Sequence, residues 1–132
     1  MIAVNQNAFE FLSGWLNSLP DFLHSIQIKN LCFDSREVSM GDCYVALPSV
    51  ANNELDYIQK ACDAGAELII CNDSISDKVI EATLPLKNVM RLSGDILHQH
   101  FGTVTNTMDV VGVTGTNGKS SICYYLAQVL DA

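Results

Sequence analysis

Residues 57–71 read YIQKACDAGAELIIC, and this stretch sets the expectation for the whole fold. Ile58, Ala61 and Cys62 recur at helical spacing, and Gly65 is typical of a residue that ends a helix. The apolar run that follows predicts a buried strand over residues 67–71. A helix that leads directly into a buried strand favours an α/β fold.

The rest of the first hundred residues continues this alternation of helices and strands. Helical spacing of apolar residues, an N-cap serine and terminating prolines predict three further helices, over residues 9–19, 76–84 and 93–101. Short apolar or alternating runs predict extended chain, over residues 26–28, 31–33, 43–47 and 89–92. Strands that alternate with helices in this way predict fold class α/β.

A glycine-rich loop between a strand and a helix carries the clearest chemistry. Residues 110–121 read VVGVTGTNGKSS, in which an apolar strand leads into the loop and a helix follows. Gly115 and Gly118 allow the backbone amides to turn towards a polyphosphate, and the helix N-terminus adds positive potential. Lys119 would neutralise the β- and γ-phosphate oxygens, and Ser120 would place its hydroxyl on Mg²⁺. The loop therefore predicts an ATP site.

This loop departs from the generic pattern G-x-x-x-x-G-K-[ST] at one position. The pattern requires a glycine five residues before Gly118, and Val113 stands there. The alternative interpretation is an ordinary tight turn between a strand and a helix. The order of strand, loop and helix around residues 118–120 favours the phosphate loop.

A short polar stretch at residues 105–108 predicts a domain boundary. The first domain is expected over residues 1–108, and residues 109–132 are expected to begin a second one. A chain of 132 residues is long enough for one compact core, so two complete domains are not expected.

Composition excludes several classes of partner. The chain has 15 acidic and 7 basic residues and a net charge of −8, which disfavours nucleic acid and anionic membranes. No apolar run approaches the ~18 residues of a membrane span, and residues 1–7 carry no Lys or Arg, so neither a spanning helix nor a signal peptide is expected. The five cysteines contain no C-x-x-C pair and are interpreted as buried free thiols. These features predict a cytoplasmic protein.

A second polar motif, Asp34-Ser35-Arg36, follows the predicted strand at residues 31–33. The Ser35 hydroxyl is both a donor and an acceptor, suited to a diphosphate or a uracil edge, and Arg36 would be a nearby fixed cation. An Asp-Ser turn with a solvated arginine accounts for the motif equally well. The residues of this motif alone leave both interpretations open.

The two motifs together resemble one enzyme family. The sequence TGTNGKS at 114–120 is similar to the phosphate loop of Mur ligases and folylpolyglutamate synthetases. The upstream residues D-S-R at 34–36, G-D-C-Y-V-A-L at 41–47 and Y-I at 57–58 resemble the UDP-binding domain of the tripeptide synthetase branch of Mur ligases. Folylpolyglutamate synthetases lack that domain. The resemblance covers residues 31–130 and implies a small mixed sheet with flanking helices, followed by the first strand, phosphate loop and helix of a P-loop ATPase domain.

The resemblance also implies which residues bind which ligand. ATP would contact residues of the loop, with Lys119 as the catalytic cation and Ser120 on Mg²⁺: Gly115, Thr116, Asn117, Gly118, Lys119, Ser120 and Ser121. The UDP-muramoyl dipeptide would contact residues of the first domain: Phe33, Ser35, Arg36, Val50, Ala51 and Asn52. This second loop departs from the family, because Ser49 replaces a usual glycine and residues 53–55 read N-E-L where D-G-[HRT] is common.

The reaction implied is phosphorylation of the D-glutamate carboxylate by ATP, after which the amine of a diamino acid attacks the acyl phosphate. The remaining Mg²⁺ ligands and the diamino-acid site would lie beyond Ala132, so this chain alone is expected to be inactive. One alternative is a stand-alone nucleotide-sugar-binding or regulatory module, and another is the sibling ligase that adds D-Ala-D-Ala. Self-association through residues 109–132 is a further expectation, and the choice between meso-diaminopimelate and L-lysine stays open.

Overall fold

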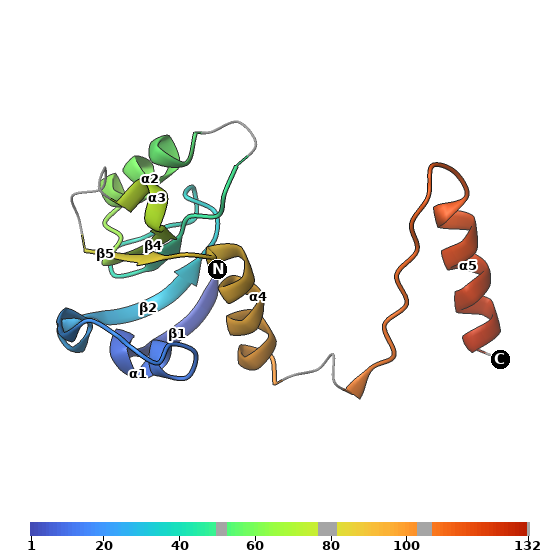
Figure 1. The fold of residues 1–132 in the computed structure, drawn as a ribbon, viewed down its shortest axis with the longest axis horizontal. Helices are drawn as coiled ribbons and strands as arrows, with labels where there is room; N and C mark the ends of the chain where they lie inside the picture. The colour runs from blue at the N-terminus through green and yellow to red at the C-terminus, as the bar shows by residue number, and fades with distance from the viewer. Residues whose placement is uncertain (50–52, 77–81, 103–106, 132) are drawn as a thin grey trace.

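Five strands form one mixed sheet, in the order β1-β2-β3-β4-β5, in the computed structural model, which describes residues 1–49, 53–76, 82–102 and 107–131 (Figure 1). The strands are β1 (Ile2–Asn7), β2 (Gln27–Cys32), β3 (Cys43–Val45), β4 (Leu68–Asn72) and β5 (Thr83–Leu86). β1 runs antiparallel to β2, whereas β2 to β5 are parallel to one another. The prediction of a small mixed α/β sheet is confirmed.

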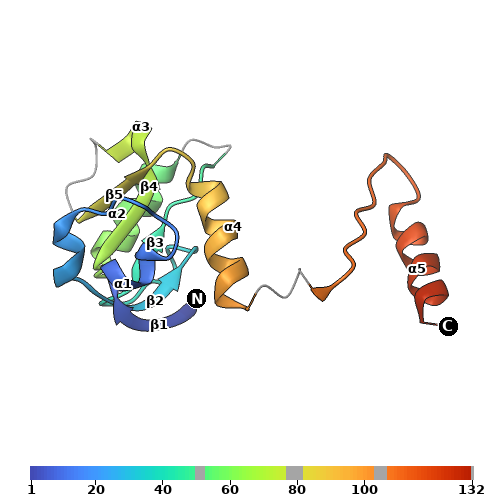
Figure 2. The ribbon, with the colours of Figure 1, turned by 60° about the horizontal axis from the view of Figure 1, so that its bottom comes forward.

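Helices cover both faces of this sheet (Figure 2). The helices on the sheet are α1 (Ala8–Ser13), the 3₁₀ helix η1 (Asp21–Ser25), α2 (Glu54–Asp63), α3 (Asp73–Ser76) and α4 (Val89–His100), and α5 (Lys119–Leu130) follows later in the chain. α1, η1 and α4 pack on one face, and α2 and α3 pack on the other. No helix of the described chain is both long and apolar enough to cross a bilayer.

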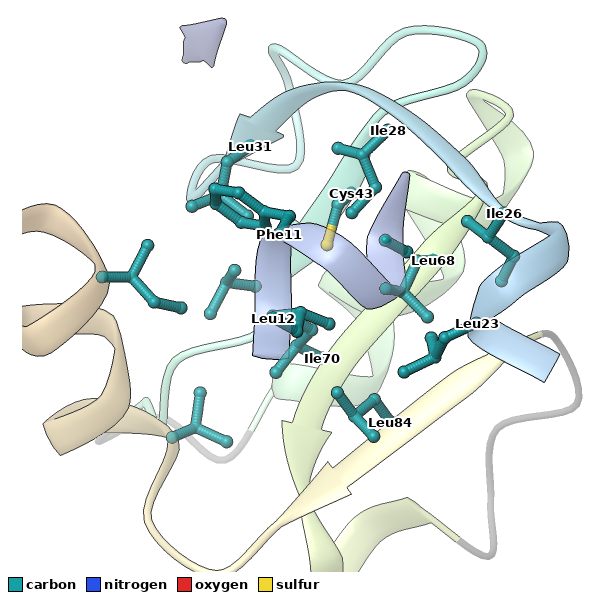
Figure 3. Close-up of a cluster of buried hydrophobic side chains, with 14 residues drawn as sticks. Phe11, Leu12, Leu23, Ile26, Ile28, Leu31, Cys43, Leu68, Ile70 and Leu84 are labelled. Atoms are coloured by element: carbon teal, nitrogen blue, oxygen red, sulfur yellow. The ribbon is translucent and has the colours of Figure 1, made fainter. Parts of the chain in front are cut away.

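The alternation of side chains along β4 shows how the two faces are filled. Leu68 and Ile70 point to the cluster under α1, whereas Ile69 and Cys71 point to the cluster under α2, and all four are fully buried. Figure 3 shows Leu68 and Ile70 among the side chains of the first cluster. A central parallel strand that is buried on both faces reads as an unbroken apolar run, and this is why residues 67–71 were recognised from sequence.

Near the sheet edges, one predicted helix was wrong and one strand was missed. Residues 83–86 form β5 and not the end of a helix, and Asp77–Glu81 of the predicted helix lie outside the described residues. Pro85 is tolerated there because β5 is an edge strand, so its missing N–H breaks no ladder on the outer side. β1 was not predicted, and its ladder with β2 is interrupted by a bulge between Ala3 and Gln6 that obscures the alternation.

The helix α4 replaces a predicted strand at residues 89–92. Asn88, rather than Ser93, caps it, because the Asn88 side chain accepts a hydrogen bond from the backbone N–H of Arg91 at 3.1 Å. Ser93 lies inside the helix and donates to the Met90 carbonyl at 2.8 Å. The first helix is also shorter than expected, since α1 ends at Ser13 with Gly14 as its C-cap.

Residues 109–131, called the tail below, are mostly exposed, whereas the sheet and its helices hold the buried core. Residues 110–113 form no strand, contrary to the prediction, since β1 to β5 make up the only sheet of the described chain and residues 110–113 pair with none of these strands. α5 forms as predicted, but none of its side chains is buried, and Ile122, Tyr125 and Leu130 are exposed apolar residues. Cys123 on this helix is exposed as well, so the expectation of uniformly buried thiols was wrong for it.

We expect a chain that ends at Met108 to keep the free energy of unfolding of the full chain within ~0.5 kcal/mol, because none of residues 109–131 is buried in the core. Urea denaturation measures this, and light scattering should show self-association only for the full chain, whose exposed apolar tail invites contacts.

A chain that ends at Asn88 is the control for this comparison of stability. It loses the buried Val89 and Ile96 of α4 and should be less stable by roughly 3 kcal/mol or more. Unfolding of the chain that ends at Met108 would place the tail within the first domain.

Candidate functional site

A pocket of about 400 Å³ opens between the end of β2 and the helix α2. This volume lies within the ~300–1,000 Å³ of small-molecule sites. Its lining consists of aromatic, hydroxyl and charged side chains: Phe33, Asp34, Ser35, Arg36, Tyr44, Tyr57 and Lys60. Ligands of open α/β sheets bind outside the carboxyl ends of the strands, and residues 33–36 follow the carboxyl end of β2 directly.

The buried carboxyl of Asp42 holds the loop that carries these residues. Its two oxygens accept hydrogen bonds from the Asn30 amide at 2.7 Å, the Ser39 backbone N–H at 2.9 Å and the Cys32 thiol at 3.6 Å. The side chain of Asp42 is fully buried. Burial first, and then the neighbouring Asp42, raise the pKa of Cys32 to about 11, so the thiol keeps its proton and remains a donor. The loop between β2 and β3 is thereby fixed at its start and its end.

Asp34 and Arg36 form a local ion pair on the rim of the pocket. The Arg36 Nε donates to both oxygens of Asp34, at 2.9 and 3.1 Å, and the Arg36 backbone N–H donates to Asp34 Oδ1 at 3.0 Å. These bonds, led by those from the side chain, lower the pKa of Asp34 to about 2. The sequence suggests Arg36 as a cation for a ligand, and in the structure its guanidinium pairs with Asp34 while 84% of its side chain stays exposed. Contact of Arg36 with a ligand stays a prediction.

Ser35 and Tyr44 form the inner wall of the pocket. Both are largely buried, with 8% of Ser35 and 4% of Tyr44 exposed. Burial raises the pKa of Tyr44 to about 12, although a hydrogen bond with the Ser35 side chain acts in the other direction. Both groups therefore present uncharged hydroxyls, which donate and accept hydrogen bonds.

The first turns of α2 form the opposite wall. The Asn53 amide donates to the Tyr57 hydroxyl at 2.9 Å, and the Ser49 hydroxyl donates to Asn53 at 3.0 Å. The ammonium of Lys60 lies 5.6 Å from the centre of the Tyr57 ring. The predicted contacts Val50, Ala51 and Asn52 lie outside the described residues.

The glycine-rich loop lies apart from this pocket in sequence, and two of its glycines have positive φ. Gly115 and Gly118 have φ of 147° and 76°, in the region that favours glycine, and Gly118 is the N-cap of α5. The Lys119 ammonium donates to the Gly115 carbonyl at 2.6 Å, so it folds back over the loop. Thr116, Asn117, Ser120 and Ser121 are exposed beside it.

Comparison with known proteins shows which ligases this chain is similar to. No family model matches the chain. The diaminopimelate ligase of Coxiella burnetii, named UDP-N-acetylmuramoyl-L-alanyl-D-glutamate–2,6-diaminopimelate ligase, is 33% identical over 112 residues, which is 81% of this chain and 22% of that protein. Proteins of the same name from Pseudomonas putida and Haemophilus influenzae are 32% and 28% identical, over 79% and 86% of this chain.

A solved structure has the same fold. The chain of a ligase with that name superposes with a TM-score of 0.63 at 20% identity, over 97% of this chain and 26% of that one. In sequence and in fold, the chain is similar to the N-terminal part of a Mur ligase. It spans 22% to 25% of the length of the three curated Mur ligases described above.

The structure brings together part of the set that the Mur ligase resemblance implied. Phe33, Ser35 and Arg36 line one pocket, whereas the loop at 115–121 contributes no residue to it. Tyr44, Tyr57 and Lys60 were not singled out as site residues. The helical spacing of Tyr57 and Lys60 was a usable signal, because residues three apart share one face of a helix.

We expect Asp42→Ala to lower the free energy of unfolding by roughly 3 kcal/mol, because three donors lose their acceptor in a buried site. Urea denaturation measures the change. Asp95→Ala, which removes an exposed carboxyl on α4, is the matched control and should stay within ~0.5 kcal/mol. A loss of less than 1 kcal/mol for Asp42→Ala would mean that the loop is held by other contacts.

We expect Arg36→Gln to raise the pKa of Asp34 from about 2 part of the way towards 3.8, since the backbone bond at residue 36 remains. Because the folded pKa is depressed, the pair stabilises the fold above pH ~4, and this contribution is lost as the pH falls through ~2. NMR titration of the carboxyl carbon reports the pKa. Arg91→Gln, which changes an exposed residue of α4, should leave it unchanged. An unaltered Asp34 pKa in Arg36→Gln would contradict the pairing.

Proposed function

We propose that this chain is the nucleotide-sugar-binding part of an ATP-dependent ligase that adds 2,6-diaminopimelate to UDP-N-acetylmuramoyl-L-alanyl-D-glutamate in peptidoglycan synthesis. The observation that carries the proposal is the similarity of 79% to 86% of the chain to ligases of that name. Of the two diamino acids expected from sequence, these names favour diaminopimelate over L-lysine. Such a reaction uses soluble precursors, so we also propose a cytoplasmic location.

The pocket at residues 33–60 supports a role in binding the UDP end of the substrate. Phe33 and Tyr57 offer aromatic surfaces for a flat base. The buried Ser35 hydroxyl offers a donor and an acceptor at the wall, which suits the polar edge of uracil. Val50, Ala51 and Asn52 remain proposed contacts, on the basis of the resemblance alone.

The loop at residues 114–121 supports a role in binding ATP. Gly115 and Gly118 adopt the conformations that a cradle of backbone amides requires, and Lys119 begins the helix that follows. Thr116, Asn117 and Ser121 would contact phosphates, and Ser120 would hold Mg²⁺, which offsets phosphate charge when it is bound. We propose that the boundary between the two units lies between residues 108 and 109.

We expect the full chain to bind UDP in isothermal titration calorimetry, and Ser35→Ala to weaken that binding by ~1 kcal/mol, or about fivefold in Kd, through loss of one neutral hydrogen bond. Thermal unfolding of the variant checks that its fold is kept. Failure of the full chain to bind UDP would reject the proposal, and equal affinity of Ser35→Ala would remove Ser35 from the site.

Two control variants sharpen this test. Ser13→Ala removes an exposed hydroxyl whose bond is to the Glu10 carbonyl within α1, so it should bind UDP as the unaltered chain does. Lys119→Gln tests whether UDP binds at the glycine-rich loop, which also attracts phosphates. Unchanged affinity in Lys119→Gln assigns UDP to the first pocket, and lost affinity assigns it to the loop, which would contradict the proposal.

A further inference from the structure

Lys60 lies in the pocket wall that α2 forms, and its side chain is exposed. Ile58 and Ala61 are the buried residues of α2, and Lys60 is exposed. Tyr57 and Lys60 both line the pocket, three residues apart on one face of the helix. The position of Lys60 is therefore set by the packing of α2 on the sheet, while its ammonium is free to move on a flexible stem.

The charged side chains around the pocket differ in whether they form ion pairs. Three charged side chains line it, Asp34, Arg36 and Lys60, and the first two neutralise each other. The Lys60 ammonium forms no ion pair with any described residue, and its contact is with the face of Tyr57. In a chain of net charge −8, this pocket thus carries one cation that forms no ion pair with a carboxylate of the described residues.

We infer that Lys60 binds the phosphate groups of a nucleotide held in this pocket. This inference rests on the proposed function and adds a residue that sets the preference for a diphosphate over a bare nucleoside. A lysine ammonium attracts phosphate as a mobile point charge, and it gains more from an anion than from the ring of Tyr57. The aromatic and hydroxyl groups at Phe33 and Ser35 would hold the base. Lys60 therefore determines how much the phosphate groups add to the free energy of binding.

The test compares UDP with uridine in calorimetric titrations of the full chain. Lys60→Gln should weaken UDP binding by about 3- to 10-fold and leave uridine binding unchanged, because the lost contact is to phosphate. The dependence of the UDP Kd on salt concentration should also become less steep in this variant. Lys60→Arg keeps the charge and should restore UDP binding to within about 3-fold of the unaltered chain.

Lys87→Gln is the matched control, since Lys87 is exposed, carries the same charge and does not line the pocket. It should change neither Kd nor the salt dependence. If the unaltered chain binds UDP and Ser35→Ala weakens it while Lys60→Gln does not, the proposed function stands and the role of Lys60 is rejected. Equal weakening of UDP and uridine in Lys60→Gln would also reject it. Binding of neither ligand by the unaltered chain would reject both proposals.

Discussion

The buried carboxyl of Asp42 is the constraint on which the candidate site depends. It lies at the start of β3 and accepts bonds from Asn30 and Cys32 of β2 and from Ser39 of the connecting loop. Without those acceptors, three donors would be left unsatisfied inside the protein, at a cost of roughly 1–3 kcal/mol each. The loop that follows β2 carries the pocket residues 33–36, and the bonds of Asp42 fix the position at which this loop rejoins the sheet.

The two-sided burial of the sheet decides what faces the pocket. Along β3, Cys43 and Val45 fill the cluster under α1, and Tyr44 fills the one under α2. Because side chains alternate along a strand, Tyr44 is on the side of α2 and reaches the same pocket as Tyr57. Gly65 lets the chain turn sharply from α2 into β4, and its φ of 89° and the approach of the Met40 backbone leave little room for a side chain. The placement of α2, and with it of Lys60, follows from this packing.

Electrostatics around the pocket is local and not a property of the whole chain. A net charge of −8 predicts repulsion of any anion at long range. The Asp34–Arg36 pair cancels itself, so the positive charge of Lys60 is what remains beside Tyr57. The same reasoning applies at residues 115–119, where backbone amides and Lys119 supply the positive potential without any basic patch.

The sequence alone determined the features that rest on local patterns. The buried run at residues 67–71, the helix before it and the start of α5 at Gly118 were predicted because period, glycine and apolar content act over a few neighbouring residues. The resemblance to Mur ligases likewise rested on contiguous motifs. Tertiary structure decided β1, β5 and α4, because pairing at a sheet edge and the burial of Val89 and Ile96 against the sheet override weak local preferences. It also decided that Tyr44, Tyr57 and Lys60 share one pocket, since Tyr44 meets the other two only when α2 packs on the sheet.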